Sequence, residues 1–129
     1  MCGNVRFSAR IVDHFHACHC DTCRKQTSVA FVGIDVDGDI ELEDPSAVRW
    51  YRSSEWGERG FCPQCGSTLF WRAPEHGKSV VSYGAFDEAP DARFTTQLFI
   101  DKKPASYSFS QKTDDLTKAE LEAMFAEEI

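Results

Sequence analysis

The stretch Cys18-His19-Cys20-Asp21-Thr22-Cys23 places three cysteines within six residues, in a Cys-x-Cys-x-x-Cys spacing. Three thiolates this close together can all turn inward on one ion at about 2.3 Å, and a metal relieves the repulsion between them. The spacing therefore predicts a metal site and a chain that folds around it.

A second cluster, Cys62-Pro63-Gln64-Cys65-Gly66, has the form of a zinc-knuckle turn. Proline presets the backbone of such a turn, and glycine lets backbone N–H groups approach the sulfurs without a side chain in the way. The sixth cysteine is Cys2, which Gly3 follows. We expect these cysteines also to serve a metal.

Disulfide formation is the alternative reading of six cysteines. The cysteines are tightly clustered, no export signal opens the sequence, and the chain of 129 residues exceeds the usual size of disulfide-dense miniproteins. A Cys-x-Cys pair also closes a ring too short for relaxed disulfide geometry. We therefore expect reduced cysteines that hold metal.

Composition limits the class of protein. With 129 residues, 42% of them hydrophobic, the chain is long enough for one core, and we expect a single domain over residues 1–129. The formal charge of −7 and the lack of a basic cluster argue against nucleic-acid binding. No long apolar run is present, so we expect no membrane segment and a cytoplasmic location.

Counting ligands leaves two arrangements open. A closed structural zinc takes four protein ligands, whereas a reactive zinc keeps three and an open position. Either one four-cysteine site forms from parts of both clusters, or the Cys-x-Cys-x-x-Cys residues form an open site and the other three cysteines form a second site. His14 and His16 are near enough in sequence to add a ligand, while His19 is expected to point away from the metal.

The segments Cys2–Phe7, Cys18–Lys25 and Arg59–Ser67 together resemble the glutathione-dependent formaldehyde-activating enzyme family, also called the centromere protein V-like domain. The resemblance runs from Cys2 to about Asp87. It implies a mainly β fold, a β-tent of zinc-binding antiparallel sheets, and two zinc ions. It assigns the structural zinc to Cys2, Cys62 and Cys65, and the reactive, open zinc to Cys18, Cys20 and Cys23.

The sequence departs from the family pattern at two places. The family has Cys-x-Cys-Gly where this chain begins Met1-Cys2-Gly3, so the structural zinc lacks one cysteine and needs water, the N-terminal amine or an upstream residue instead. The segment Gln97-Leu98-Phe99-Ile100 stands where family members often have His-Ile, and Tyr107 lies near the place of a frequent tryptophan.

The resemblance implies an enzyme, a carbon–sulfur lyase that forms or cleaves S-(hydroxymethyl)glutathione or a related thiol–aldehyde adduct. Its partners would be a thiol such as glutathione and a small aldehyde. Glutathione is anionic, so its candidate contacts are the cations Arg24, Lys25, Arg52 and Arg59. The alternative is a noncatalytic, zinc-stabilised protein-interaction module, and a homo-oligomer is compatible with either function.

Hydrophobic periodicity supports a sheet-rich domain with a short C-terminal α-helix. Alternation predicts a strand from Val5 to Ile11. Further strands are expected over residues 29–34, 48–51, 68–71, 79–83 and 95–100, which are rich in β-branched or aromatic residues. A helix is predicted over residues 117–128, because Thr117 and Glu120 form a capping box.

Overall fold

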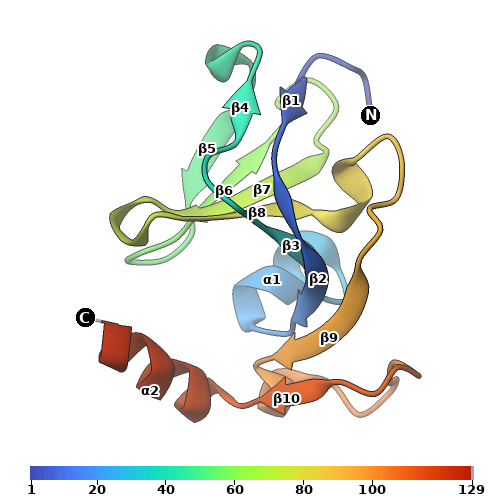
Figure 1. The fold of residues 1–129 in the computed structure, drawn as a ribbon, viewed down its shortest axis with the longest axis vertical. Coiled ribbons are helices and arrows are strands. Elements are labelled where there is room, and N and C mark those ends of the chain that lie inside the picture. The colour runs from blue at the N-terminus through green and yellow to red at the C-terminus, as the bar shows by residue number, and fades with distance from the viewer. Residues whose placement is uncertain (129) are drawn as a thin grey trace.

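The computed structural model describes residues 1–128, which form two β-sheets and two α-helices (Figure 1). The smaller sheet pairs β1 (Phe7–Ser8) with β4 (Glu41–Leu42). The larger sheet has eight strands in the order β10-β9-β2-β3-β8-β7-β6-β5. In chain order its strands are β2 (Ile11–Cys18), β3 (Phe31–Val36), β5 (Arg49–Arg52), β6 (Glu58–Phe61), β7 (Thr68–Ala73), β8 (Lys78–Ser82), β9 (Arg93–Leu98) and β10 (Asp114–Leu116). The mainly β class predicted from the sequence is confirmed.

The large sheet is antiparallel from β2 through β3, β8, β7 and β6 to β5. At its other end, β9 pairs in parallel with both β2 and β10. Sequence periodicity identifies strands but not their direction, so these parallel pairings were not part of the expectation. They place the end of β9 beside Cys18, where β2 ends.

The strand expected from Val5 to Ile11 is divided in the structure. Phe7–Ser8 pairs with β4 in the small sheet, whereas the chain joins the large sheet from Ile11 onward. The alternation in the sequence is nevertheless real, because Val5, Phe7 and Ile11 pack against one core cluster. The alternation thus predicted which side chains face inward, but it did not predict which strand the segment pairs with.

The other five expected strands correspond to β3, β5, β7, β8 and β9, with ends shifted by a few residues. Sequence analysis missed β4, β6 and β10, and of β2 it predicted only the first residue, Ile11. The short strand β6 contains Gly60, and glycine weakens a strand signal. The glycine is needed here because a Cβ at position 60 would lie 2.9 Å from the Trp50 ring and 3.1 Å from Phe70.

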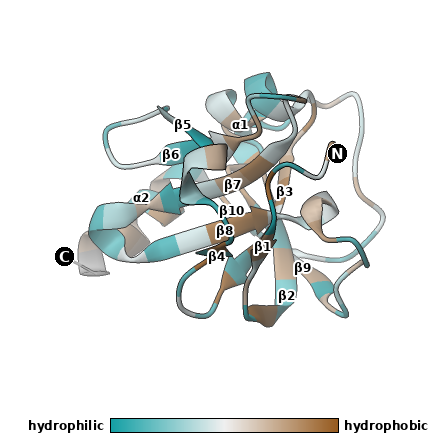
Figure 2. Cartoon of the chain, turned by 90° about the horizontal axis from the view of Figure 1, so that it is seen from above, coloured by the Kyte–Doolittle hydropathy of each residue, from teal (hydrophilic) through white to brown (hydrophobic). Residues whose placement is uncertain are grey.

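The main core lies on one face of the large sheet and centres on Phe70, which is fully buried. Phe7 from the small sheet meets the Phe70 ring edge-on at 5.0 Å, and Trp50 stacks against it at 5.9 Å. Figure 2 shows hydrophobic segments along β3, β7 and β8, whereas α1 (Asp21–Thr27) is largely hydrophilic.

The predicted C-terminal helix is confirmed as α2 (Lys118–Glu128), at the lower left of Figure 1. The Thr117 hydroxyl accepts a hydrogen bond from the Glu120 backbone N–H at 3.3 Å and donates one to the Glu120 carboxylate at 3.0 Å. Phe125 packs edge-on against Trp56 at 4.7 Å, so the helix docks on its own chain. Within residues 1–128, neither helix has the length and hydrophobicity needed to cross a bilayer.

Candidate metal centre

The six cysteines lie in two groups of three, and within each group the sulfur atoms are all within 4.8 Å of one another. The helix triad, as we name it, consists of Cys18, Cys20 and Cys23. The turn triad consists of Cys2, Cys62 and Cys65. Among the side chains of residues 1–126, neither group includes a histidine or a carboxylate as a further ligand.

The helix triad is assembled at the junction of β2 and α1. Cys18 is the last residue of β2, Cys20 is the N-cap of α1, and Cys23 lies within that helix and is buried. Sequence analysis missed α1, which has seven residues and no hydrophobic periodicity. The sequence features that could have indicated this helix are Asp21 in the first turn and basic residues in the last turn, which complement the helix dipole.

A hydrophobic wall backs the helix triad on the face of the sheet opposite the main core. Phe31 from β3 and Val80 from β8 are buried in this second cluster. Trp71, Leu98 and Phe99 pack against it. The sulfurs therefore lie between aromatic and aliphatic side chains, with Cys20 the most exposed of the three.

Mutual hydrogen bonds separate the acidities of the helix-triad thiols. Hydrogen bonds with Cys18 and Cys23 lower the pKa of Cys20 far below that of an ordinary thiol. The bonds with Cys20 and Cys23, together with burial, raise the pKa of Cys18. The bond with Cys18 lowers the pKa of Cys23, but the bond with Cys20 and burial outweigh it and raise that pKa to about 11. The most exposed of the three sulfurs is thus the most acidic.

His19 is fully buried and faces away from the helix triad. Its Nε2 lies 2.8 Å from the Gln97 side-chain oxygen, and its Nδ1 lies 3.4 Å from the Tyr107 hydroxyl. Its backbone N–H donates to the Leu98 carbonyl at 3.0 Å. These bonds hold the Cys18–Cys20 segment against the end of β9 and against Tyr107. No local spacing in the sequence indicates this role of Gln97 and Tyr107.

The turn triad joins the N-terminal segment to the turn between β6 and β7. The turn is closed by hydrogen bonds from Gly66 N–H to the Cys62 carbonyl at 2.7 Å and from Cys62 N–H to the Ser67 carbonyl at 3.0 Å. Gly66 has φ +78°, which favours glycine. Cys62 is 2% exposed and belongs to the main core, whereas Cys2 is exposed.

Both triads fit a zinc ion. Four sulfurs arranged tetrahedrally about zinc at about 2.3 Å lie about 3.8 Å from one another. The Cys2 and Cys62 sulfurs lie 3.7 Å apart, and all sulfur pairs of both triads fall within 4.8 Å. Thiolates are soft donors, which favours zinc over magnesium or calcium. Each triad can therefore hold a metal, and the identity of the metal stays a prediction.

The four cations expected to contact glutathione lie in different environments. Lys25 is exposed on α1. Arg24 donates to Asp21 at 2.6 Å and to the His19 carbonyl at 3.0 Å. Arg52 is exposed and donates to the Glu55 carbonyl. Arg59 is 5% exposed and faces the helix triad from β6.

The remaining histidines near the first cluster lie along β2 and face other partners. His14 Nδ1 lies 3.0 Å from the neighbouring Asp13 carboxylate. His16 Nδ1 lies 3.8 Å from Asp35, and burial lowers the pKa of His16. Neither belongs to a triad, so the structure gives no support to a histidine as fourth ligand.

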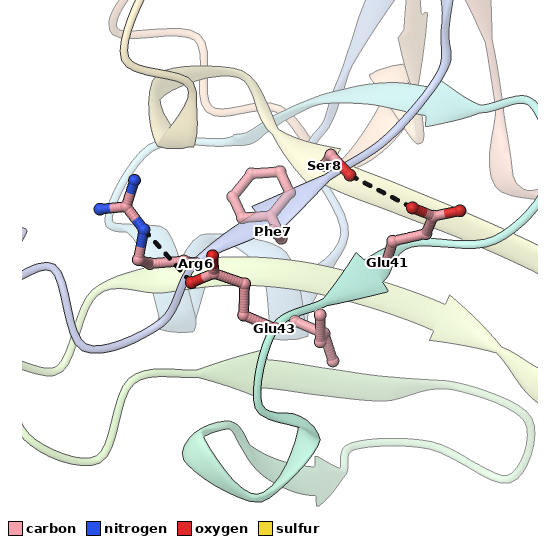
Figure 3. A pocket seen from close by; sticks show the side chains of 6 residues that line it. Arg6, Phe7, Ser8, Glu41 and Glu43 are labelled. Carbon is pink, nitrogen blue, oxygen red and sulfur yellow. Dashed lines mark hydrogen bonds and ion pairs between the residues drawn. The ribbon is translucent and has the colours of Figure 1, made fainter.

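A shallow pocket elsewhere lies against the small sheet (Figure 3). Arg6 pairs with Glu43 at 3.3 Å across it, and Ser8 donates to Glu41 at 3.5 Å. The groups that line it are partnered with each other and include no cysteine. The triads are therefore the stronger candidates for chemistry.

Comparison with known proteins points to one family. The family model described as glutathione-dependent formaldehyde-activating enzyme matches residues 1–102. A Schizosaccharomyces pombe protein named an uncharacterized lyase is 32% identical over 124 residues, which is 94% of this chain and 90% of the relative. The crystal structure of a Rhodobacter sphaeroides protein has a similar fold, with a TM-score of 0.59 and 15% identity, covering 73% of this chain and 94% of that one.

Proposed function

Because the chain belongs to the glutathione-dependent formaldehyde-activating enzyme family, we propose that it is a zinc-dependent carbon–sulfur lyase. Its reaction would form or cleave S-(hydroxymethyl)glutathione or a related adduct of a thiol and an aldehyde. The observation that carries the proposal is the helix triad, where three sulfurs converge and the side chains of residues 1–126 add no fourth ligand. Since zinc takes four ligands, three protein ligands leave room for a substrate.

The reaction is an addition in which atoms balance without a further reactant. The thiol sulfur bonds to the aldehyde carbon, and the thiol hydrogen ends on the aldehyde oxygen. Zinc held by the helix triad would supply an electron-pair acceptor at which a thiol loses its proton near neutral pH. Trp71, Leu98 and Phe99 pack beside the sulfurs and limit the access of water.

The charge of the substrate suggests where the rest of it lies. Glutathione carries carboxylates, and Lys25 on α1 is exposed and forms no hydrogen bond or ion pair with the side chains of residues 1–126. Arg24, one residue earlier, is already paired with Asp21. We therefore propose Lys25 as the first carboxylate contact, with Arg24 and Arg52 as secondary contacts.

The turn triad has a different role in this proposal. Cys62 is part of the main core, and Cys2 ties the N-terminal segment to it across the 3.7 Å between their sulfurs. A zinc ion there would stabilise the fold and would leave the reaction to the helix triad.

Exchange spectroscopy by NMR tests the proposed reaction. The metal-loaded protein is added to an equilibrium mixture of formaldehyde and glutathione, and the exchange rate between free formaldehyde and the adduct is measured. We expect this rate to rise with protein concentration and to return to the uncatalysed rate in Cys20→Ser. A rate unchanged by parent protein whose zinc content has been verified would overturn the proposal for this substrate pair.

A further inference from the structure

Arg59 is a buried cation with all three of its guanidinium nitrogens engaged. It is 5% exposed. Its Nε donates to the Ser53 hydroxyl at 3.1 Å, and its Nη1 donates to the Gln26 side-chain oxygen at 2.9 Å. Its Nη2 donates to the Thr22 hydroxyl at 2.8 Å and to Cys23 Sγ at 3.3 Å. The guanidinium is thus held in one orientation, against the helix triad.

Only one of these partners can carry a charge opposite to that of Arg59. No carboxylate of residues 1–126 pairs with it, and its oxygen acceptors are two hydroxyls and an amide. A buried cation is costly unless an opposite charge accompanies it. Among its contacts only the Cys23 sulfur can carry negative charge, as it does when it is a metal ligand.

Thr22 extends the contact to a second sulfur of the triad. Its hydroxyl oxygen accepts from Arg59 and lies 3.3 Å from Cys20 Sγ. The hydroxyl hydrogen has no other acceptor among the described residues, so it can be donated to the Cys20 sulfur. Arg59 therefore contacts Cys23 directly and is linked to Cys20 through Thr22. Both contacts can place a hydrogen-bond donor against a sulfur, which suits a negatively charged sulfur.

The formal charge of the zinc-bound helix triad shows how a neighbouring cation changes the charge of the site. Three thiolates and one zinc ion carry a formal charge near −1, and a thiolate as fourth ligand would bring it to about −2. Doubling a negative charge in a partly buried site is unfavourable. With Arg59 included, the same two states carry about 0 and −1.

We propose that Arg59 is a positioning residue that provides the counter-charge of the helix triad and thereby allows this site to accept an anionic sulfur ligand. The inference deepens the proposed function, on which it rests for the idea that a thiol binds at this triad. It also separates Arg59 from the other three cations, which face the surface and are candidates to hold the substrate's carboxylates.

Ligand binding to the cobalt(II)-substituted protein tests this role without any turnover. Parent, Arg59→Gln and Arg59→Lys are loaded with cobalt(II) and titrated with 2-mercaptoethanol and, separately, with imidazole, a neutral ligand. The cobalt absorption bands report binding. Binding that persists in Cys20→Ser belongs to the turn triad and is subtracted. Arg6→Gln, which removes an exposed arginine paired with Glu43, is the matched control.

We expect Arg59→Gln to weaken thiol binding by about 10-fold to 100-fold, the range for a lost hydrogen bond to a charged group. Imidazole binding should change much less, because imidazole adds no charge. Arg59→Lys should fall between the parent and Arg59→Gln for the thiol, and Arg6→Gln should match the parent.

Equal losses for thiol and imidazole, or no loss for either, would overturn the counter-charge role, since structural damage does not distinguish the two ligands. If Arg59→Gln does not fold, Arg59→Lys decides. A loss of thiol affinity smaller than about 10-fold, with imidazole binding unchanged, supports the role. A loss of thiol affinity as large as that expected of Arg59→Gln, or an equal loss for both ligands, contradicts it. If thiol binding depends on Arg59 but the protein does not accelerate exchange between formaldehyde and its glutathione adduct, this inference is supported and the proposed reaction is contradicted. A parent that binds no thiol at the helix triad would remove the inference itself.

Discussion

At the scale of single residues, Cys65 and Cys2 belong to the same triad but differ in acidity. The Ser67 hydroxyl, 3.2 Å from the Cys65 sulfur, and the Ser67 backbone N–H lower the pKa of Cys65 to about 5. For Cys2 the hydrogen bond from the Asn4 backbone lowers the pKa, but desolvation and the neighbouring thiols outweigh it and raise the pKa.

This difference predicts an order of alkylation in protein from which metal has been removed. Thiolates react with iodoacetamide and thiols do not, so the rate for Cys65 should rise with pH through about 5 and level off by about pH 6.5. Cys2 is more exposed but should react more slowly at that pH. Peptide mapping by mass spectrometry gives the order. Modification of Cys2 before Cys65 would contradict the assigned acidities.

At the scale of elements, the contact between β3 and β8 determines how closely the sheet packs behind the helix triad. Gly33 on β3 has no side chain, and a Cβ there would overlap the Val80 side chain and come within 2.8 Å of the Phe31 ring. Both residues belong to the cluster that surrounds the triad. The absence of a side chain at position 33 therefore sets the position of the hydrophobic wall.

Gly33→Ala is accordingly expected to destabilise the protein by about 1–3 kcal/mol, the cost typical of overpacking. Gly84→Ala is the control, because a Cβ at position 84 meets nothing within 4 Å and should change stability by less than about 0.5 kcal/mol. Denaturant unfolding of the two variants provides the comparison. Similar stabilities would show that β3 and β8 adjust without cost.

The docking of α2 is the second test at this scale. Phe125 packs against Trp56 at 4.7 Å, while the adjacent Met124 is 51% exposed. Phe125→Ala should therefore destabilise by about 1–2 kcal/mol and alter tryptophan fluorescence, because a partly buried aromatic contact is lost. Met124→Ala should leave both quantities near the parent's. The opposite order would mean that another face of the helix is docked.

At the scale of the whole molecule, each triad joins a different set of elements. The helix triad links the end of β2 to α1, whereas the turn triad connects the N-terminal segment with the β6–β7 turn and the main core. We expect metal analysis to find two zinc ions per chain. Chelation should lower the melting temperature, and zinc but not magnesium should restore it, since sulfur ligands suit zinc. A melting temperature unaffected by complete zinc removal would refute this coupling.

The two triads should also differ in their importance for folding. Cys65→Ser should cost about 3 kcal/mol or more, or cause aggregation, because zinc binding at the core is coupled to folding. Cys20→Ser should lose one zinc ion and keep most of the stability, because Cys20 is partly exposed at the start of α1. Thermal melts and zinc content measured together separate these outcomes. Equal destabilisation by the two substitutions would contradict the division of roles.

The sequence was informative wherever the relevant residues are close along the chain. Cys18, Cys20 and Cys23 must lie near one another because few bonds separate them, and Thr117 caps α2 through Glu120, three residues later. Alternation likewise identified which side chains of the first strand region face the core. The short helix α1 escaped detection because seven residues hold too few turns for a periodic signal.

Contacts that depend on strand pairing across the sheet could not be predicted from local sequence patterns. The parallel alignment of β9 with β2 puts Gln97 beside the segment that holds His19, and the register of β6 with β7 presents Arg59 on the same face as Trp71. Arg59 meets Cys23 although 36 residues separate them. A local pattern carries no information on strand register. The spacing of the cysteines therefore predicts that sulfur clusters exist, whereas strand pairing brings Arg59 against one of them.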